Sequence, residues 1–387
     1  MITRATCLIL VFMVMQVQSQ PRRSGSPQTG KYWVYVGTAN YGGAPSRKLY
    51  LCSFDDSTGE LKLIGLAAET ENPAFLAMHS DRGYLYSTNE VGDLDNEKTG
   101  GVSSFRVDSK TGKLELLNQV HSFGANPAHI TVSRNGKFVL VPSYYGGTVS
   151  LPILANGSLG AVAGKVKESG KGVNLQRQEG SHPHSVVLSP DNRFAIVVDL
   201  GLDKLFVYKF DQQTGELEAN TPPFVEAPSG SGPRHLAFAP NAKFAYVVNE
   251  LQSTVSTYSY EAGDGIFQLR QTISTLPSGA AAENTGAEIQ VAPSGKFVYV
   301  SNRGHDSIAV FAVTRDGTLT PVQDIPTGGK TPRNFEFDPS GKFLLVGNQD
   351  SNEIAVFRVD EITGRLTPTG TKVEVTAPVC LLFGERQ

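Results

Sequence analysis

The sequence feature that most constrains the fold is a short motif that returns about every 46–56 residues. In each copy, a Pro or Gly is followed by two variable residues and then by apolar residues at alternate positions. The copies are NPAFLAMHS from Asn72, NPAHITVSR from Asn126, HPHSVVLSP from His182, GPRHLAFAP from Gly232, TGAEIQVAP from Thr285, TPRNFEFDP from Thr331 and the truncated APVCLLF from Ala377. Self-similarity at this period is typical of an array of one supersecondary unit. We therefore expect one repeat architecture, although 387 residues alone would suggest two or three domains.

Each full copy continues into a turn and further strand-like segments. A turn such as SDRG or PSGK leads to a second segment such as KFAYVVN and a third such as SIAVFAV, and a T-G-x-L hairpin signal often precedes a fourth. Period-2 alternation with β-branched and aromatic residues indicates antiparallel strands. The 40 Gly and 22 Pro residues exclude long helices. The pattern predicts an all-β fold, a seven-bladed β-propeller with four antiparallel strands per blade.

The two ends of the array predict how the ring closes. It begins with KYWVYVGTAN, which aligns with second strands, and stops with APVCLLF, which aligns with first strands. We expect a 1+3 closure by the C-terminal strand, with residues 379–383 paired to residues 33–37. Cys52 and Cys380 then lie two strands apart, which is about 10 Å because neighbouring strands are about 4.8 Å apart. A disulfide needs Cα atoms within about 7 Å, so we expect none.

The first residues are typical of an export signal. Residues 1–19 contain one positive charge, an apolar run of 11 residues and small or β-branched residues near the end. The run is too short to span a bilayer, which takes about 20 apolar residues. We expect a signal peptide at 1–19, a flexible N-terminus at 20–30, one propeller domain at 31–387 and an exported protein, periplasmic or extracellular. A retained membrane anchor or a wrongly assigned start is the alternative.

Charge and motif content limit the function classes. Lys+Arg 34 against Asp+Glu 37 gives a net charge of -3 with no basic block, which argues against a nucleic-acid partner. There is no Gly-x-Ser-x-Gly elbow, Walker loop, His-Glu-x-x-His or dinucleotide fingerprint in the sequence. We expect a monomer that acts on a small molecule without a cofactor.

Polar residues recur in two columns of the repeat alignment, at the start of the first strand and the end of the second. These positions lie at the same end of an up-and-down blade, on the strands nearest the axis, so they should line one solvent-open mouth of the central channel. The first column holds His129, His184, Arg234, His235, Glu288, Arg333 and Asn334, with His182 just before its anchor. The second holds Asn89-Glu90, Tyr144-Tyr145, Asp199, Asn249-Glu250, Asn302-Arg303 and Asn348-Gln349, followed by His305.

The columns have structural as well as functional interpretations. Asn89, Asn249, Asn302 and Asn348 are at positions where amide side chains commonly cap loops through local hydrogen bonds. The charged residues could pair around the axis as structural salt bridges. We favour a ligand site, because convergent titratable groups in a concavity are typical of one. The pair His182 and His184 lacks a clear third ligand, so we expect no metal.

Four segments resemble the lactonase family of seven-bladed propellers, which includes propeller-type 6-phosphogluconolactonases and fungal carboxymuconate cyclases. They are HPHSVVLSPDNRFAIVVDLG, GPRHLAFAPNAKFAYVVNE, GAEIQVAPSGKFVYVSNRGHDSIAVF and TPRNFEFDPSGKFLLVGNQDS, and the resemblance extends over about residues 31–383. It implies hydrolysis of a small sugar-acid or carboxylate lactone, or the reverse cyclisation. A phosphogluconolactone is a cytoplasmic metabolite, so an export signal favours another lactone. A non-catalytic propeller for surface interaction is the main alternative, and a quinone- or haem-dependent dehydrogenase is a weaker one.

The resemblance also implies catalytic residues. The cyclase branch uses a His, an Arg, a Glu and a second Arg, which fall here on His184 (or His182), Arg234, Glu250 and Arg303 (or Arg333). Glu250 or His184 would activate water, and the arginines would stabilise the oxyanion and the carboxylate. The substrate-binding candidates are His129, Arg177, Gln178, His182, His235, Glu288, His305, Arg333 and Asn334.

Overall fold

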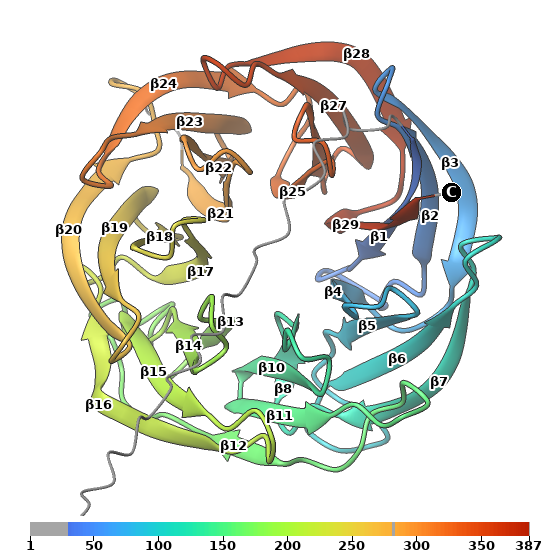
Figure 1. Cartoon of the computed structure of the whole chain (residues 1–387), viewed down its shortest axis with the longest axis vertical. Helices are drawn as coiled ribbons and strands as arrows, with labels where there is room; N and C mark the ends of the chain where they lie inside the picture. Colours follow the sequence, from blue (N-terminus) through green and yellow to red (C-terminus); the bar gives the residue numbers. More distant parts are fainter. Residues whose placement is uncertain (1–29, 281–282, 387) are drawn as a thin grey trace, which may run out of the picture.

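The computed structural model describes residues 30–280 and 283–386. The predicted signal peptide at 1–19 and nearly all of the predicted flexible segment at 20–30 lie outside the described residues. Within the described part, every regular element is a β-strand, and the strands form seven antiparallel sheets around a central axis (Figure 1). The predicted seven-bladed propeller is confirmed.

Each blade runs outward from the axis in four positions. The innermost strands are β4 (Pro73–Met78), β8 (Ala125–Pro127) with β9 (Thr131–Val132), β13 (Pro183–Leu188), β17 (Pro233–Phe238), β21 (Thr285–Val291), β25 (Pro332–Phe337) and β29 (Pro378–Arg386). The second strands are β1 (Lys31–Thr38), β5 (Tyr84–Asn89), β10 (Phe138–Tyr145), β14 (Phe194–Asp199), β18 (Phe244–Asn249), β22 (Phe297–Arg303) and β26 (Phe343–Asn348). The third are β2 (Leu49–Asp55), β6 (Gly101–Val107), β11 (Thr148–Pro152), β15 (Lys204–Phe210), β19 (Thr254–Glu261), β23 (Ser307–Val313) and β27 (Glu353–Val359). The outermost are β3 (Glu60–Ala68), β7 (Leu114–His121), β12 (Gly164–Val166), β16 (Leu217–Glu226), β20 (Ile266–Ser274), β24 (Leu319–Pro326) and β28 (Leu366–Glu374).

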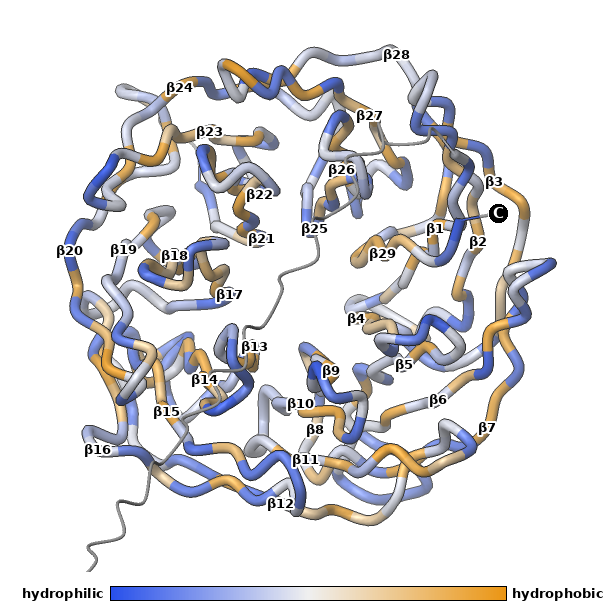
Figure 2. Tube along the Cα trace, in the orientation of Figure 1, coloured by the Kyte–Doolittle hydropathy of each residue, from blue (hydrophilic) through white to orange (hydrophobic). Residues whose placement is uncertain are grey.

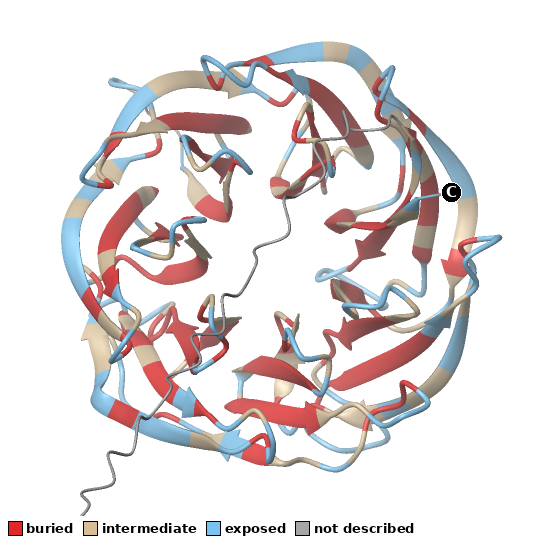
Figure 3. Ribbon diagram, in the orientation of Figure 1, coloured by how far each residue is buried: buried red, intermediate tan, exposed pale blue. Residues whose placement is uncertain are grey.

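The position of a strand in its blade explains its apolar pattern. Second strands such as β14 and β26 are buried at every residue, because neighbouring blades cover both faces. The outermost strand β28 alternates between buried or half-buried and exposed residues along most of its length, because its outer face meets water. Figure 3 shows this gradient from the inner strands to the rim, and in Figure 2 the connecting turns are mostly hydrophilic. The core is therefore a set of layers between blades.

A glycine in the outer hairpin of each blade locks neighbouring blades together. All seven of these glycines have φ between 68° and 87°, a region that other residues rarely adopt. A Cβ on any of them would lie 2.1–2.8 Å from an aromatic ring on the second strand of the preceding blade. The pairs are Gly59–Phe343, Gly112–Trp33, Gly157–Tyr84, Gly215–Phe138, Gly265–Phe194, Gly317–Phe244 and Gly364–Phe297. The T-G-x-L hairpin signal thus marks a contact between blades.

The ring closes in the 1+3 manner that the sequence predicts. The closing sheet has the order β29-β1-β2-β3, and Gly37 pairs with Cys380 while Val34 pairs with Phe383. Cys52 is also opposite Val34, on the other side of β1. Both thiols are buried and free, as predicted from the strand order.

The third blade departs from the regular pattern. Its innermost strand is divided into β8 and β9, and its outermost strand β12 has only three residues. The carbonyl oxygen of Pro142, on β10, accepts a hydrogen bond from the amide of Ala128. In an antiparallel strand, the nitrogen and the carbonyl of one residue face the same neighbouring strand, so the ring nitrogen of Pro142 also faces the inner strand. Because proline has no N–H, the ladder is interrupted there. His129 lies in this interruption.

Candidate active site

A β-bulge near the mouth end of the innermost strand recurs in six of the seven blades, and in three of them the single extra residue has a titratable side chain. On β17, Pro233 pairs with Asn249 and His235 pairs with Val248, so Arg234 is the extra residue. The same shift makes His184 the extra residue on β13 and Arg333 the extra residue on β25. Bulges commonly re-aim side chains beside functional sites. Here they bring three residues of the predicted first column together.

Glu250 lies at the centre of the mouth and contacts three guanidinium groups. Its Oε1 is 2.5 Å from Arg177 Nη2, and its Oε2 is 3.1 Å from Arg234 Nε and 2.9 Å from Arg303 Nη2. Glu250 is 4% exposed, so this cluster is more enclosed than the solvent-open mouth that we expected from the sequence. Arg234 and Glu250 belong to the two predicted columns at the ends of the first and second strands of one blade, and their side chains meet as that placement implies.

Positive charge exceeds negative charge in this cluster. Burial alone would raise the pKa of Glu250, but Arg303, Arg234 and Arg177 together lower it to about 2. Burial and the neighbouring guanidinium groups of Arg303 and Arg333 lower the pKa of Arg234 to about 9, because Glu250 offsets only part of their repulsion. All these groups stay ionised at neutral pH. The cluster therefore favours an additional negative charge, such as the oxyanion that forms when a carbonyl is attacked.

A second layer of polar groups lies directly beneath the mouth. His235 is 3.2 Å from Arg234 Nη1 through Nε2 and 3.2 Å from Glu288 Oε1 through Nδ1. Asn334 donates to Glu288 Oε2 at 2.6 Å and accepts from the Leu381 amide at 2.8 Å. Because a guanidinium can only donate, His235 accepts at Nε2 and donates from Nδ1 to the carboxylate. The layer therefore fixes both the tautomer of His235 and the position of Arg234.

Two histidines of the first column carry buried ring nitrogens without partners in the described residues. These atoms are Nδ1 of His184 and Nδ1 of His129. Their rings lie 5.2 Å and 5.3 Å from the His235 ring, centroid to centroid. Burial, assisted by nearby positive charge, holds the pKa of His184 well below its usual 6.5. His184 is therefore a neutral imidazole, able to accept a proton.

The loop before β13 supplies Arg177 to the mouth, but its other two candidates are bonded within the protein. Gln178 is fully buried and donates to Asp203 Oδ1 at 2.7 Å, so it holds the loop in place. His182 stacks on Tyr144 with ring centroids 4.3 Å apart, and its Nε2 is 3.0 Å from Glu179. Stacked in this way, His182 forms part of the wall of the mouth.

The asparagines at the ends of the second strands behave mostly as caps. The amide nitrogens of Asn89, Asn249 and Asn302 donate to nearby hydroxyl and carbonyl oxygens at 2.7–3.3 Å. Asn348 differs, because both of its amide atoms are buried without a partner in the described residues. His305 bonds to Ser307 at 2.8 Å and lies 3.5 Å from Asp324, so its ring turns toward its own blade.

Two residues at the mouth were not among the predicted catalytic or substrate-binding residues. Tyr41, in the loop between β1 and β2, donates to Glu90 Oε2 at 2.8 Å and lies beneath the guanidinium of Arg333. Glu90 occupies the same alignment column as Glu250, so the sequence did carry its signal. Tyr41 lies outside every repeat motif, and only its place in a glycine-rich insertion at the mouth end of the blade could have indicated it.

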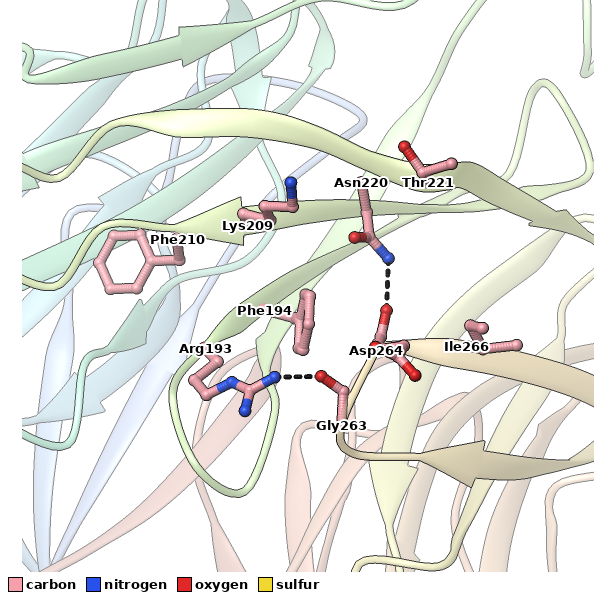
Figure 4. A pocket seen from close by; sticks show the side chains of 9 residues that line it. All are labelled: Arg193, Phe194, Lys209, Phe210, Asn220, Thr221, Gly263, Asp264 and Ile266. Carbon is pink, nitrogen blue, oxygen red and sulfur yellow. Dashed lines mark hydrogen bonds between the residues drawn. The ribbon is translucent and has the colours of Figure 1, made fainter.

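A separate groove lies between the fourth and fifth blades, at the opposite end of the strands (Figure 4). It has a volume of about 500 Å³ and includes Arg193, Phe194, Lys209 and Asp264 in its lining. Arg193 donates to the Gly263 carbonyl, and Asn220 donates to the Asp264 carbonyl at 2.8 Å. The groove contains the glycine hairpin that packs on Phe194, so it is a seam of the inter-blade contact. Its polar side chains bond to backbone carbonyls or pair with neighbouring carboxylates, and we do not assign a site to it.

No group of three His, Cys, Asp or Glu side chains that could hold a metal ion is found in residues 30–280 and 283–386. The described part of the chain also has no helix that is long and apolar enough to cross a membrane.

Comparison with known proteins places this geometry in a family. Residues 33–383 match the family described as "Lactonase, 7-bladed beta-propeller". The 6-phosphogluconolactonase of Bacillus subtilis is 38% identical over 91% of this chain and 98% of its own length, and that of Formosa agariphila is 33% identical over 83% and 91%. The structure of a periplasmic gluconolactonase from Pseudomonas aeruginosa superposes with a TM-score of 0.84 at 34% identity, covering 92% of this chain and all of the other. The chain belongs to the lactonase family of seven-bladed β-propellers.

Proposed function

We propose that this protein hydrolyses the lactone of a small sugar acid, and that the reaction takes place at the Glu250 mouth. The observation that carries the proposal is a buried cluster in which three guanidinium groups contact the single carboxylate of Glu250 and leave a net positive charge. The neutral imidazole of His184 lies beside this cluster. Lactone hydrolysis creates a negative charge on the carbonyl oxygen and ends in a carboxylate, so an excess of fixed positive charge stabilises both. The relatives named 6-phosphogluconolactonase and gluconolactonase support this substrate class.

The proposed reaction begins with proton transfer from water to a base. The water oxygen bonds to the lactone carbonyl carbon, and the carbonyl oxygen becomes an oxyanion that faces Arg234 and Arg303. The bond from that carbon to the ring oxygen then breaks, and the protonated base returns its proton to the ring oxygen. The products are a hydroxyl group and a carboxylic acid, which ionises. Arg303 keeps a buried Nε without a partner in the described residues, a donor that is free to meet the oxyanion.

His184 suits the role of the base better than Glu250. A carboxylate with a pKa near 2 binds protons too weakly to take one from water efficiently. Both oxygens of Glu250 are also engaged by arginines. We assign Glu250 to holding the three guanidinium groups in place, and His184, whose Nδ1 has no partner in the described residues, to proton transfer.

We also propose that the protein is exported and works as a monomer. The apolar run at residues 5–15 supports export, and the periplasmic gluconolactonase of Pseudomonas aeruginosa is a relative for which the same compartment is named. Fractionation of the producing cells tests the location, since recovery of uncleaved protein in the cytoplasm would contradict it. Light scattering of the purified protein tests the monomer.

A lactone panel with acid release followed at constant pH tests the function. The panel contains glucono-δ-lactone, 6-phosphoglucono-δ-lactone and a muconate-type lactone, each corrected for spontaneous hydrolysis. We expect turnover that is lost in Arg234→Gln and retained in Arg193→Gln, because Arg193 lies in the groove at the opposite end of the strands. Absence of turnover on every lactone would contradict the proposal and favour a binding role.

A further inference from the structure

The arginines at the mouth differ in one respect. Arg177, Arg234 and Arg303 each contact Glu250, whereas Arg333 has no carboxylate oxygen within 4.0 Å among residues 30–280 and 283–386. The carboxylates of Glu90, Glu250 and Asp350 act on it only from longer range. Removing a charge from water costs free energy unless the charge is paired, and Arg333 is half-buried. Arg333 is therefore the guanidinium that is left for an anion.

Tyr41 holds this guanidinium in place. The Arg333 Cζ is 4.6 Å from the centre of the Tyr41 ring, within the range of a cation–π contact. The Tyr41 hydroxyl donates to Glu90, which is 9% exposed and is fixed at the end of β5. A cation–π contact supplies no carboxylate, so the charge of Arg333 still lacks a counter-ion within 4.0 Å among residues 30–280 and 283–386.

The loop that carries Tyr41 is anchored at its base. The side-chain oxygen of Asn72 accepts from the amides of Asn40 at 3.1 Å and Ser46 at 2.7 Å, on the two sides of the loop. The Asn72 side chain also donates to the Glu90 carbonyl at 3.0 Å. The same asparagine thus ties the Tyr41 loop to the strand end that bears Glu90, and the ring is presented to Arg333 from a fixed frame.

We propose that Arg333 binds an oxyanion substituent of the substrate, a phosphate monoester or a carboxylate distant from the lactone carbonyl, and that Tyr41 is the residue that positions Arg333 for this. The inference rests on the proposed lactonase function and adds the feature that selects among lactones. Arg234 and Arg303 serve the carbonyl, which every lactone has, while Arg333 serves a group that only acidic lactones have. Loss of Arg333 should therefore weaken the binding of anionic lactones and spare a neutral one.

The test compares kcat and KM for 6-phosphoglucono-δ-lactone, a carboxylate-bearing muconate-type lactone and neutral glucono-δ-lactone. In Arg333→Gln we expect KM for the favoured anionic lactone to rise about 100-fold, at least about 10-fold more than any rise in KM for the neutral lactone. In Tyr41→Ala we expect about a 10-fold rise in the same KM, in line with one lost cation–π contact, and in Tyr41→Phe most of the parent behaviour. The anionic lactone that responds identifies the substituent as phosphate or carboxylate.

A matched control is Arg303→Gln, which should lower turnover of neutral and anionic lactones alike because Arg303 contacts Glu250. Equal losses on all lactones in Arg333→Gln, or parent kinetics in Tyr41→Ala, would overturn the inference. If the parent protein turns over no lactone, the proposed function fails, and calorimetric titrations with inorganic phosphate and with acetate then decide this inference separately. Binding that is lost in Arg333→Gln supports the anion site, and absence of binding to the parent refutes it.

Discussion

Replacing Glu250 with Gln should damage both the stability and the activity of this protein. Gln keeps the shape of the side chain and one acceptor oxygen, but it removes the charge that three guanidinium groups share at 2.5–3.1 Å. A pKa lowered from 4.5 to about 2 corresponds to a preference for the ionised carboxylate of about 3 kcal/mol, at about 1.4 kcal/mol per pKa unit. Removal of one partner from a buried ion pair typically costs about 3–5 kcal/mol, which agrees.

Urea unfolding followed by Trp33 fluorescence and by circular dichroism measures the first effect. Trp33 is the single tryptophan, and it lies on β1 of the closing blade. We expect the free energy of unfolding to fall by about 3 kcal/mol and kcat/KM to fall about 100-fold, because displaced arginines no longer meet the oxyanion. Arg193→Gln is the control: it should leave kcat/KM unchanged and lower the free energy of unfolding by no more than about 1 kcal/mol, since the hydrogen bond that it loses is exposed. A Glu250→Gln protein with unchanged stability would refute the argument that the cluster is buried and mutually dependent, and one with full activity would remove Glu250 from the site.

Three other predictions follow from the described contacts. Burial and nearby positive charge hold the pKa of His184 well below 6.5, so the imidazole stays neutral into the acid range. We therefore expect kcat/KM to stay level from about pH 8 to below pH 6.5 and to fall only when His184 is protonated. An inflection above pH 6.5 would contradict this. Gly215→Ala places a Cβ 2.4 Å from Phe138 and should destabilise the fold by about 2–4 kcal/mol. The control Gly370→Ala has a similar φ but no neighbour within 4 Å, so it should cost only about 1–2 kcal/mol. Equal urea midpoints for the two variants would refute the inter-blade contact. Removal of residues 378–387 deletes β29 and exposes the edge of β1, so cooperative thermal unfolding should be lost, and a melting curve like that of the full chain would argue against the closure.

The repeat made the fold and the convergence of the two polar columns predictable, because each blade places equivalent residues at equivalent points. Arg234 and Glu250 could be paired from their columns alone. Interactions that cross between repeats could not be predicted in this way. Tyr41 lies in an insertion without a counterpart in other blades, and Gln178 turns inward to Asp203 for reasons set by its own loop. The low pKa of Glu250 likewise depends on Arg177 reaching the mouth from that loop.

The closing blade has a consequence for the order in which the protein can mature. β1 leaves the ribosome early, but its inner neighbour β29 is the last strand of the ring to be synthesised. The Leu381 amide of β29 also supports Asn334, and through it Glu288, His235 and Arg234. A nascent chain therefore carries neither a closed ring nor a supported Arg234, however many blades it has already folded. The onset of lactone hydrolysis would report the moment at which the two ends of the ring meet.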